Sequence, residues 1–488
     1  MIQFPFKKDL GLAITLLIVL IIGIITMPAE ECPGDAMAVR VETVHFLQNG
    51  SFGVSAEIAT KYWGDRGMFF DQNEVTGQWY PKYGIMNTIV YMPALTVEKL
   101  IKGRIQQVSS PLRLFLLNIH NIFLSLLCAS SFYLLARLFT SSDLISAIWS
   151  LSVIYMTFCW FYLRAQIFEI HTLLFLSWAL YFFIISYRSV RECNIELPGN
   201  STIWLLLSGL CIGAEILSKT VYVLLAGLSF VGWILIPEFR RIICKKHTLL
   251  FFTPIISAVI LVLISNQIKF GSALNTGYTQ WAAESKPLSG ELLRGISGYL
   301  FDTQWGVFSC FPILLLAVFY WRKFIRNYPI ETGIIISVGF ILLLVNSCFV
   351  NWRGVWSYGP RYLLPILPAL SLPSIYLLES ILDMKGKTLK IICIITLGVA
   401  GIYAVSLQEF MQRYPFYTWY QLDIALSKVY TPAVTRYMYG TPFWQINKDI
   451  SSCLSGNESP LASLIAEDQY KAVKECIRSL PLNYYWLR

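Results

Sequence analysis

A single aspartate stands just beyond the first apolar run of the chain. Residues 10–27 are apolar, and Asp35 follows directly on Gly34. The apolar residues of 37–47 have helical spacing, which predicts a short amphipathic helix on a membrane surface that ends at Gly50. A carboxylate at the start of such a helix can accept backbone N–H bonds as its N-cap. It can equally take a proton from a substrate hydroxyl as a general base.

Other polar side chains fall on the same membrane face as Asp35 when the chain is threaded by hydropathy and loop charge. Ionisable groups near hydrocarbon are costly, so several of them at one leaflet indicate a functional site. The set comprises Lys82, Arg164, Glu169, His171, Glu215, Lys219, Lys269, Tyr278 and Arg361.

Each member of this set also has a purely structural explanation. Arg164 and Lys269 can extend their charged ends to lipid headgroups. Glu215 and Lys219, spaced i,i+4, can form a side-chain ion pair that does no more than stabilise a helix. A histidine such as His171 is more often satisfied inside a bundle, and Tyr278 fits an aromatic belt at the lipid–water interface.

The composition is that of an integral membrane protein. The 488 residues are 56% hydrophobic and only 14% charged, whereas soluble domains average about 25% charged residues. The net charge of +9 does not indicate nucleic-acid binding, because the basic residues lie in short loops between apolar runs.

The first apolar run is interpreted as an uncleaved transmembrane helix. Cys453 and Cys476 in the polar tail are either a disulfide or two free thiols.

About eleven transmembrane helices are predicted, because a span needs roughly 20 apolar residues. They cover residues 9–27, 112–138, 143–162, 166–187, 202–218, 219–236, 247–266, 304–321, 331–350, 361–380 and 389–406.

Loop charges orient these helices. Basic residues at 188–191, 240–246, 322–326 and 385–390 mark cytoplasmic loops. The first polar loop, 28–111, then lies outside, and its short apolar segment 84–95 becomes an interfacial or re-entrant helix. Residues 267–303 and 351–360 form further outer loops. Residues 1–406 form one transmembrane module, and 407–488 form a small non-cytoplasmic tail.

Several motifs of soluble enzymes are missing from the sequence. It contains no Asp-x-Asp pair, the carboxylates with which soluble glycosyltransferases hold a metal and a nucleotide sugar. It also contains no P-loop, no GxSxG elbow and no HExxH motif. Chemistry driven by a nucleotide on the cytoplasmic side is therefore disfavoured.

The order of several short motifs resembles the membrane-embedded glycosyltransferases of the GT-C fold. The resemblance is to the dolichyl-phosphate-mannose protein mannosyltransferase group and its bacterial polyprenyl-phosphate-sugar relatives, and it extends to about residue 380. The matching stretches are "GDAMAVR", "QNGSFGV", "YPKYG", "GAEILSKTVYVLL", "FGSALNTGY" and "WSYGPRYLLPILP". It implies an all-α polytopic GT-C-like bundle with interfacial helices in the first outer loop.

The resemblance also implies a reaction and residues to perform it. The donor would be a sugar on polyprenyl phosphate, the acceptor a hydroxyl of a glycan, lipid or protein, and Asp35 the general base. Lys82, Lys219 and Arg361 match positions where relatives place basic residues near the donor phosphate, and Glu169 is nearest to a second acid. Relatives often carry two tandem acids at the Asp35 motif, whereas this chain has Asp-Ala.

Transfer by this route needs no cofactor, no metal ion is expected, and the sugar would be transferred with inversion. The active site is predicted to face the periplasm from a bacterial inner membrane. Remaining substrate contacts are expected from Arg164, Glu169, His171, Tyr83, Tyr278, Trp352 and Tyr358. Three alternatives stay open: a transporter or flippase of lipid-linked sugars, a polysaccharide polymerase or ligase, and a membrane scaffold.

Overall fold

The protein is described by a computed structural model. It describes residues 9–32, 34–62, 69–105, 110–192, 199–235, 245–278, 290–303, 305–350, 352–354 and 358–411, together with 445, 448, 449, 452 and 486. The following predictions concern residues outside this description: the state of Cys453 and Cys476, the basic loop at Arg240 and Arg241, and most of the tail.

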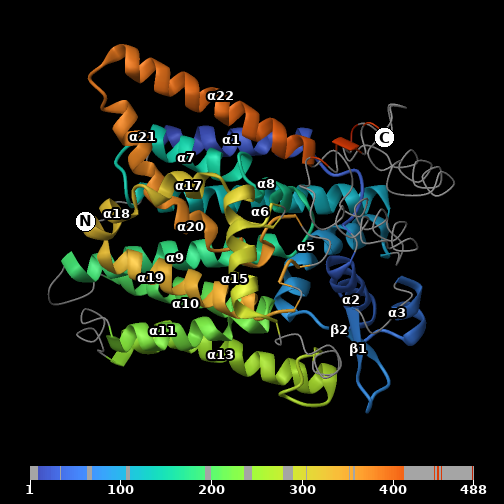
Figure 1. Ribbon diagram of the computed structural model, residues 1–488. Helices are drawn as coiled ribbons and strands as arrows, with labels where there is room; N and C mark the ends of the chain where they lie inside the picture. Colours follow the sequence, from blue (N-terminus) through green and yellow to red (C-terminus); the bar gives the residue numbers. More distant parts are fainter. Residues whose placement is uncertain are drawn as a thin grey trace.

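Roughly parallel helices form the body of the molecule (Figure 1). Among the described residues, five helices are long and apolar enough to cross a membrane: α6 (Pro111–Arg137), α9 (Glu169–Glu192), α13 (Lys245–Phe270), α19 (Pro329–Ser347) and α22 (Lys387–Met411). Shorter apolar helices accompany them: α1 (Leu10–Ile25), α7 (Asp143–Tyr155), α10 (Gly199–Ser218) and α11 (Val223–Leu235). The chain is therefore an integral, multi-pass, all-α membrane protein, as the hydropathy pattern predicted.

Three of the predicted spans are broken rather than continuous. Residues 143–162 divide into α7 and α8 (Cys159–Arg164). Residues 304–321 divide into α16 (Val307–Cys310), α17 (Ile313–Val318) and the start of α18 (Trp321–Asn327), and residues 361–380 into η2 (Arg361–Leu363), α20 (Leu367–Ser371), η3 (Leu372–Ser374) and α21 (Ile375–Leu382). Proline explains the second and third cases, because it has no N–H to donate within a helix. Pro312 precedes α17, while Pro368 and Pro373 stand at the starts of α20 and η3.

An outer module covers one end of the bundle (Figure 1). It contains α2 (Asp35–Asn49), α3 (Ala56–Tyr62), an antiparallel hairpin of β1 (Phe70–Gln72) and β2 (Trp79–Pro81), and α5 (Ile85–Lys102). The apolar segment predicted at 84–95 is thus the first part of α5, which packs against α2 and α6. A further helix, α15 (Leu292–Phe301), packs against α19.

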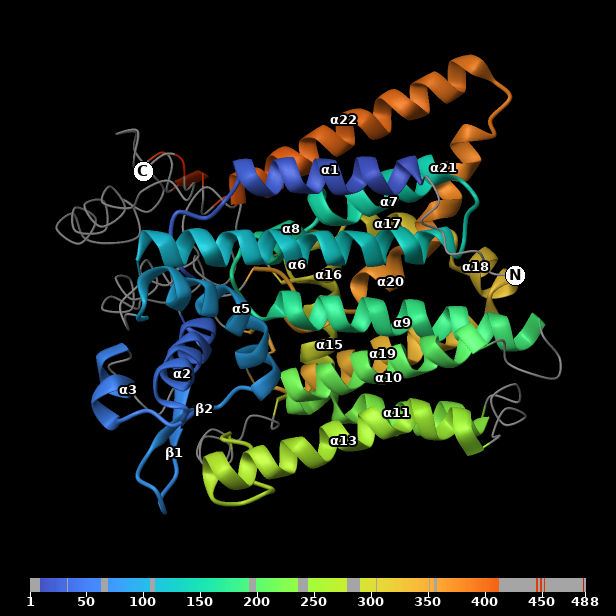
Figure 2. The ribbon, with the colours of Figure 1, turned by 180° about the vertical axis from the view of Figure 1, so that it is seen from behind.

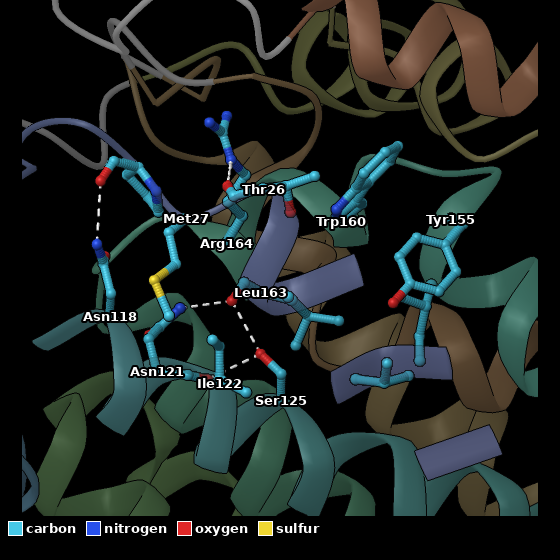
Figure 3. Close-up of a pocket in the computed structure, with 14 residues that line it drawn as sticks. Thr26, Met27, Asn118, Asn121, Ile122, Ser125, Tyr155, Trp160, Leu163 and Arg164 are labelled. Carbon is cyan, nitrogen blue, oxygen red and sulfur yellow. Dashed lines mark hydrogen bonds between the residues drawn. The ribbon is translucent and has the colours of Figure 1, made fainter. Parts of the chain in front are cut away.

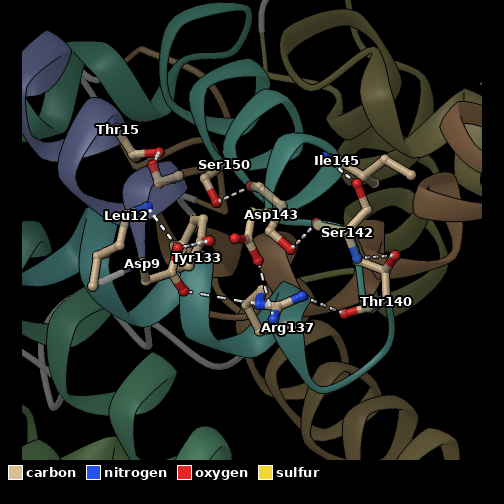
Figure 4. Close-up of polar contacts among 12 residues, drawn as sticks. Asp9, Leu12, Thr15, Tyr133, Arg137, Thr140, Ser142, Asp143, Ile145 and Ser150 are labelled. Carbon is tan, nitrogen blue, oxygen red and sulfur yellow. Dashed lines mark hydrogen bonds and ion pairs between the residues drawn. The ribbon is translucent and has the colours of Figure 1, made fainter. Parts of the chain in front are cut away.

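Two of the predicted basic loops that the structure describes lie at the opposite end of the bundle from the outer module. Both α18 and the turn between α21 and α22 are found there (Figure 2), which agrees with the orientation derived from loop charge. An ionic cluster ties α1, α6 and α7 together at that end (Figure 4). Arg137 contacts Asp143 at 3.0 Å and Asp9 at 4.0 Å, and the Tyr133 hydroxyl donates to Asp9.

Candidate active site

Asp35 is the first residue of α2, but it does not cap the helix. The N-cap is Gly34, whose φ of 73° suits glycine, and no side chain caps this end. The N-cap interpretation of Asp35 is therefore wrong by one position. Its Oδ1 instead accepts a hydrogen bond of 2.5 Å from the Tyr83 hydroxyl, so the carboxylate faces a neighbouring segment rather than the end of its own helix.

The α2 helix is also not the surface helix that its pattern predicted. Its residues 38–44 are all buried. The surrounding segments explain the difference: α5 packs along α2, and the hairpin strand β2 and the end of α13 lie against it. The prediction that Gly50 ends the helix is confirmed, since Gly50 is its C-cap with a left-handed φ of 71°.

Arg361 joins Asp35 to two more ionised groups. Its Nη1 lies 3.9 Å from Asp35 Oδ2 and 3.7 Å from Glu169 Oε1. Glu169 Oε1 also accepts from Lys219 Nζ at 3.2 Å. Two cations and two carboxylates from four distant segments of the chain therefore meet at the outer end of the bundle. We call this group, Asp35, Glu169, Lys219 and Arg361, the charged cluster.

The members of the charged cluster differ in exposure. The side chains of Asp35, Lys219 and Arg361 are 27%, 19% and 16% exposed, whereas that of Glu169 is 1% exposed. A ligand that approaches from the surface can therefore reach the first three. Glu169 lies beneath both cations, where one carboxylate oxygen serves as their shared counter-charge.

Aromatic rings surround the charged cluster. The Tyr83 ring packs on Phe168 at 5.1 Å and meets Tyr278 edge-on at 6.4 Å. Lys219 lies over Phe168, and Arg361 lies 4.8 Å from the Tyr362 ring and donates to its hydroxyl. Rings beside a guanidinium or ammonium group stabilise the cation and hold it in place. The sequence analysis did not single out Phe168 or Tyr362, although each is adjacent to a predicted residue.

The environment of Asp35 favours proton uptake. Burial raises the pKa of the Asp35 carboxyl above its usual value, while Arg361 and the Tyr83 hydrogen bond act to lower it. Burial and the nearby Asp35 charge raise the pKa of the Tyr83 hydroxyl well above its ordinary value, so Tyr83 remains a donor. The Asp35 carboxylate can therefore take a proton from an approaching hydroxyl.

We expect Tyr83→Phe to shift the pH dependence of catalysis. The lost hydrogen bond stabilises the ionised carboxylate, so its removal raises the pKa of Asp35 and moves the acidic limb of the pH–kcat profile upward. At neutral pH kcat should fall roughly 3- to 10-fold. The measurement is a pH profile of transfer. Tyr80→Phe is the control, since the Tyr80 hydroxyl bonds Gln78 instead, and equal shifts in both variants would contradict this role.

Lys82 and His171 interact with residues outside the charged cluster: Lys82 with Asp71, and His171 with Asn87. Lys82 is buried, and its charge lowers the pKa of Asp71, which burial raises. His171 is buried too, and its Nδ1 lies 2.9 Å from Asn87 Oδ1. The Nδ1 contact agrees with the structural explanation of His171, whereas its buried Nε2 has no hydrogen-bond partner within the described residues.

Lys219 and Glu215 do not form the expected helix pair. Lys219 is the residue after the end of α10, and its ammonium group pairs with Glu169. Its contact with Glu215 is a backbone hydrogen bond from the Lys219 N–H to the Glu215 carbonyl. Glu215 is fully buried, and neither carboxylate oxygen has a hydrogen-bond partner within the described part of the chain. Glu31, in the segment before α2, has a buried side chain that pairs with Arg40 at 3.3 Å.

Arg164 lies on the wall of a separate small cavity (Figure 3). Its Nε donates to the Thr26 carbonyl, and the side chain is buried rather than extended to lipid headgroups. Asn121 and Ser125 also line this cavity, and both donate to the Leu163 carbonyl. No member of the charged cluster lines the cavity, so the structure does not join Arg164 to Asp35 through it.

Trp352 is buried and Tyr358 is half-buried, and both contact protein segments outside the charged cluster. Trp352 packs against Tyr299 at 5.2 Å, and its carbonyl accepts from the Tyr299 hydroxyl. The Tyr358 hydroxyl donates to Gln408 at 3.1 Å, and its carbonyl accepts from Tyr162. In this structure both rings therefore pack against protein. Within the described residues, no group of three or more His, Cys, Asp or Glu side chains is placed to hold a metal ion.

Several solved structures have a similar arrangement of helices. An Archaeoglobus fulgidus oligosaccharyltransferase in complex with zinc and sulfate matches with a TM-score of 0.50 and 14% identity, over 90% of this chain and 58% of that one. ArnT from Cupriavidus metallidurans bound to undecaprenyl phosphate matches at 0.49 and 11% identity, over 91% and 78%. The archaeal oligosaccharyltransferase AglB with an inhibitory peptide and dolichol-phosphate matches at 0.48 and 13%, over 89% and 59%.

The chain has the GT-C fold. The predicted fold class is thereby confirmed, and the identity is too low for the likeness to show more than the fold. No protein-family model matches the chain, and no curated protein matches its sequence. The roles of individual residues rest on the geometry described above.

Proposed function

We propose that the protein transfers a sugar from a polyprenyl-phosphate-linked donor to an acceptor hydroxyl. The observation that carries the proposal is the charged cluster: a reachable carboxylate, Asp35, stands beside two reachable cations, Arg361 and Lys219. A base and a cationic phosphate site side by side are the two parts that such a displacement requires. The GT-C fold is compatible with this reaction, since an oligosaccharyltransferase has the same fold.

The chemistry is a single displacement at the sugar C1. The acceptor oxygen forms a bond to C1 and gives its proton to the Asp35 carboxylate. The bond from C1 to the phosphate oxygen breaks, and its electron pair leaves with the lipid phosphate. Arg361 and Lys219 stabilise the charge that develops on the leaving oxygen. One displacement of this kind inverts the anomeric centre.

Glu169 acts on the two cations in this proposal. Its buried carboxylate holds Lys219 at 3.2 Å and Arg361 at 3.7 Å, so it fixes the spacing of the groups that would grip the phosphate. Lys82 stays a proposal for the same role, with Asp71 beside it as its counter-charge. The site is proposed to face the non-cytoplasmic side, since the basic α18 helix and the basic turn between α21 and α22 lie at the other end of the bundle.

The proposal is tested by a transfer assay on the purified full chain in liposomes. Polyprenyl phosphates that carry different labelled sugars are supplied with a mixed acceptor fraction, and release of polyprenyl phosphate is followed with the labelled product. Mass spectrometry of glycans and lipids from a deletion strain identifies the natural sugar and acceptor. Movement of intact lipid-linked sugar across the bilayer without bond cleavage would instead establish a flippase.

We expect Lys219→Met to weaken donor binding. Loss of a charge-assisted hydrogen bond to phosphate should raise the KM for the donor roughly tenfold or more, while Asp35 keeps its contacts to Tyr83 and Arg361. The measurement is initial-rate kinetics at varied donor concentration. Lys323→Met is the matched control, because Lys323 also lies over an aromatic ring, Tyr376 at 4.1 Å, in the α18 helix at the other end of the bundle. An unchanged donor KM in Lys219→Met would remove it from the phosphate site.

A further inference from the structure

A second buried ion pair lies behind the candidate site. Glu42 of α2 and Lys269 of α13 approach to 2.5 Å, and their side chains are 0% and 3% exposed. Thr88 of α5 donates its hydroxyl to the other carboxylate oxygen of Glu42, also at 2.5 Å. Three helices therefore meet at one carboxylate. The explanation of Lys269 as a lysine that reaches to lipid headgroups is wrong, because its charged end turns inward.

The position of Glu42 connects it to Asp35. The two residues are seven positions apart on α2, which places them on the same side of the helix two turns from each other. Arg40 holds α2 from another direction: it pairs with Glu31 and donates to the Gln166 carbonyl at 3.1 Å. Hence α2 carries two buried ionic attachments within eight residues of the proposed base.

The position of Lys269 connects it to Tyr278. Lys269 is in the last turn of α13, and the chain then turns at Gly271 with φ 74° and continues to Tyr278. Asn266 donates to the Ala273 carbonyl at 3.2 Å, which folds this loop back on the helix. The ring of Tyr278 lies 6.4 Å from that of Tyr83, the donor to Asp35.

We propose that the buried Glu42–Lys269 pair is a clasp that positions the site. It joins α2 to the outer end of α13 and thereby sets where Asp35 stands relative to Tyr278 and the charged cluster. The α13 helix packs along α10, and its outer end also meets β2 and accepts a hydrogen bond from Asn73 at the Ile268 carbonyl. The clasp is the ionic contact that ties this outer end to α2. Glu42 and Lys269 are positioning residues, and neither touches the reacting groups.

The catalytic part of this inference rests on the proposed function. A misplacement of the base by about 1 Å costs roughly 10²-fold in rate, whereas the donor phosphate is held by groups outside α2. Loss of the clasp should therefore lower kcat and leave the donor KM nearly unchanged. A merely structural pair would instead change the yield of folded protein, with kcat per folded molecule unchanged.

The test uses paired substitutions in the full chain. Removal of one partner leaves a buried uncompensated charge, whereas replacement of both by apolar residues is often tolerated. The variants are Glu42→Met with Lys269→Met, and the exchanged pair Glu42→Lys with Lys269→Glu. The matched control is Glu98→Gln with Arg113→Met, which removes a pair of 2.7 Å that is equally buried and joins α5 to α6.

The expected kinetic result separates the clasp from the control. The apolar double variant should fold and lose about 10- to 100-fold in kcat, with the donor KM changed less than about twofold. The exchanged pair should recover most of that loss, and the control pair should retain the wild-type kcat. A wild-type kcat in the folded apolar double variant would overturn the proposal.

A distance measurement keeps the inference separate from the proposed function. Spin labels at Asn49 and Ser272, both exposed, report the separation of α2 from the loop after α13 by pulsed electron paramagnetic resonance. The wild type and the exchanged pair should give one narrow distribution, and the apolar double variant a broadened or shifted one. An unchanged distribution would overturn the clasp even if transfer is measured, and absence of transfer in the wild type would overturn only the function.

Discussion

Asp35→Asn should abolish sugar transfer while the protein continues to fold and bind its donor. The amide keeps the size of the side chain and can still accept the Tyr83 hydrogen bond, but it cannot take the acceptor proton. General-base catalysis contributes about 10²- to 10⁴-fold, so kcat should fall by that factor. Donor binding should change little, because Lys219 and Arg361 remain. The measurement combines transfer kinetics with donor binding at equilibrium.

The same substitution, Asp35→Asn, should not destabilise the folded protein at neutral pH. Burial raises the pKa of Asp35 above its value in the unfolded chain, so the folded state prefers the protonated form. The contribution of this group to stability is therefore fully present below the unfolded pKa and is lost as the pH rises through the folded pKa. An uncharged amide escapes that loss, and Asp35→Asn should melt no lower than the wild type at neutral pH.

The control for Asp35→Asn is Asp143→Asn. Asp143 also stands in the first turn of a helix and pairs with an arginine, Arg137 at 3.0 Å, but at the other end of the bundle (Figure 4). Its variant should transfer sugar at the wild-type rate. Transfer by Asp35→Asn at the wild-type rate would refute the assignment of the base, whereas equal losses in both variants would indicate a general defect of the protein.

Hydropathy was sufficient to predict the bundle because lipid imposes it. A span must be about 20 apolar residues long, and loop charge orients it, so the helices and their two ends can be derived from local composition. Even the breaks in residues 304–321 and 361–380 have a local cause in Pro312, Pro368 and Pro373. What failed here was the assumption that each apolar run is one unbroken helix.

The contacts within the site could not be derived in the same way. The i,i+4 spacing of Glu215 and Lys219 indicated a local pair, but Lys219 meets Glu169, which is 50 residues earlier in the chain. The apolar pattern of α2 is compatible with a surface helix, but other segments, α5 and the end of α13 among them, pack against it and bury Glu42. Pairings between distant segments depend on tertiary structure, which periodicity within one segment does not contain.

Arg361→Met should also lower kcat strongly, because Arg361 contacts the proposed base and is proposed to stabilise the departing phosphate. Its Nη1 lies between Asp35 Oδ2 and Glu169 Oε1, at 3.9 Å and 3.7 Å. Removal of one donor to a developing charge costs about 10²- to 10³-fold in kcat. The loss of a nearby cation also raises the pKa of Asp35 further, so the acidic limb of the pH–rate profile should move upward.

Arg361→Lys distinguishes charge from geometry at this position. A lysine keeps the positive charge but lacks the planar fork that can face two partners, so transfer should be only partly restored and the pH profile should return toward that of the wild type. Arg188→Met is the matched control, since Arg188 likewise pairs with one carboxylate, Glu331 at 2.9 Å, and lies over two aromatic rings, Phe139 and Tyr328. If Arg361→Met retained wild-type kcat and pH dependence, the charged cluster would be a structural network, because the cation at its centre would be unnecessary for the departure of phosphate.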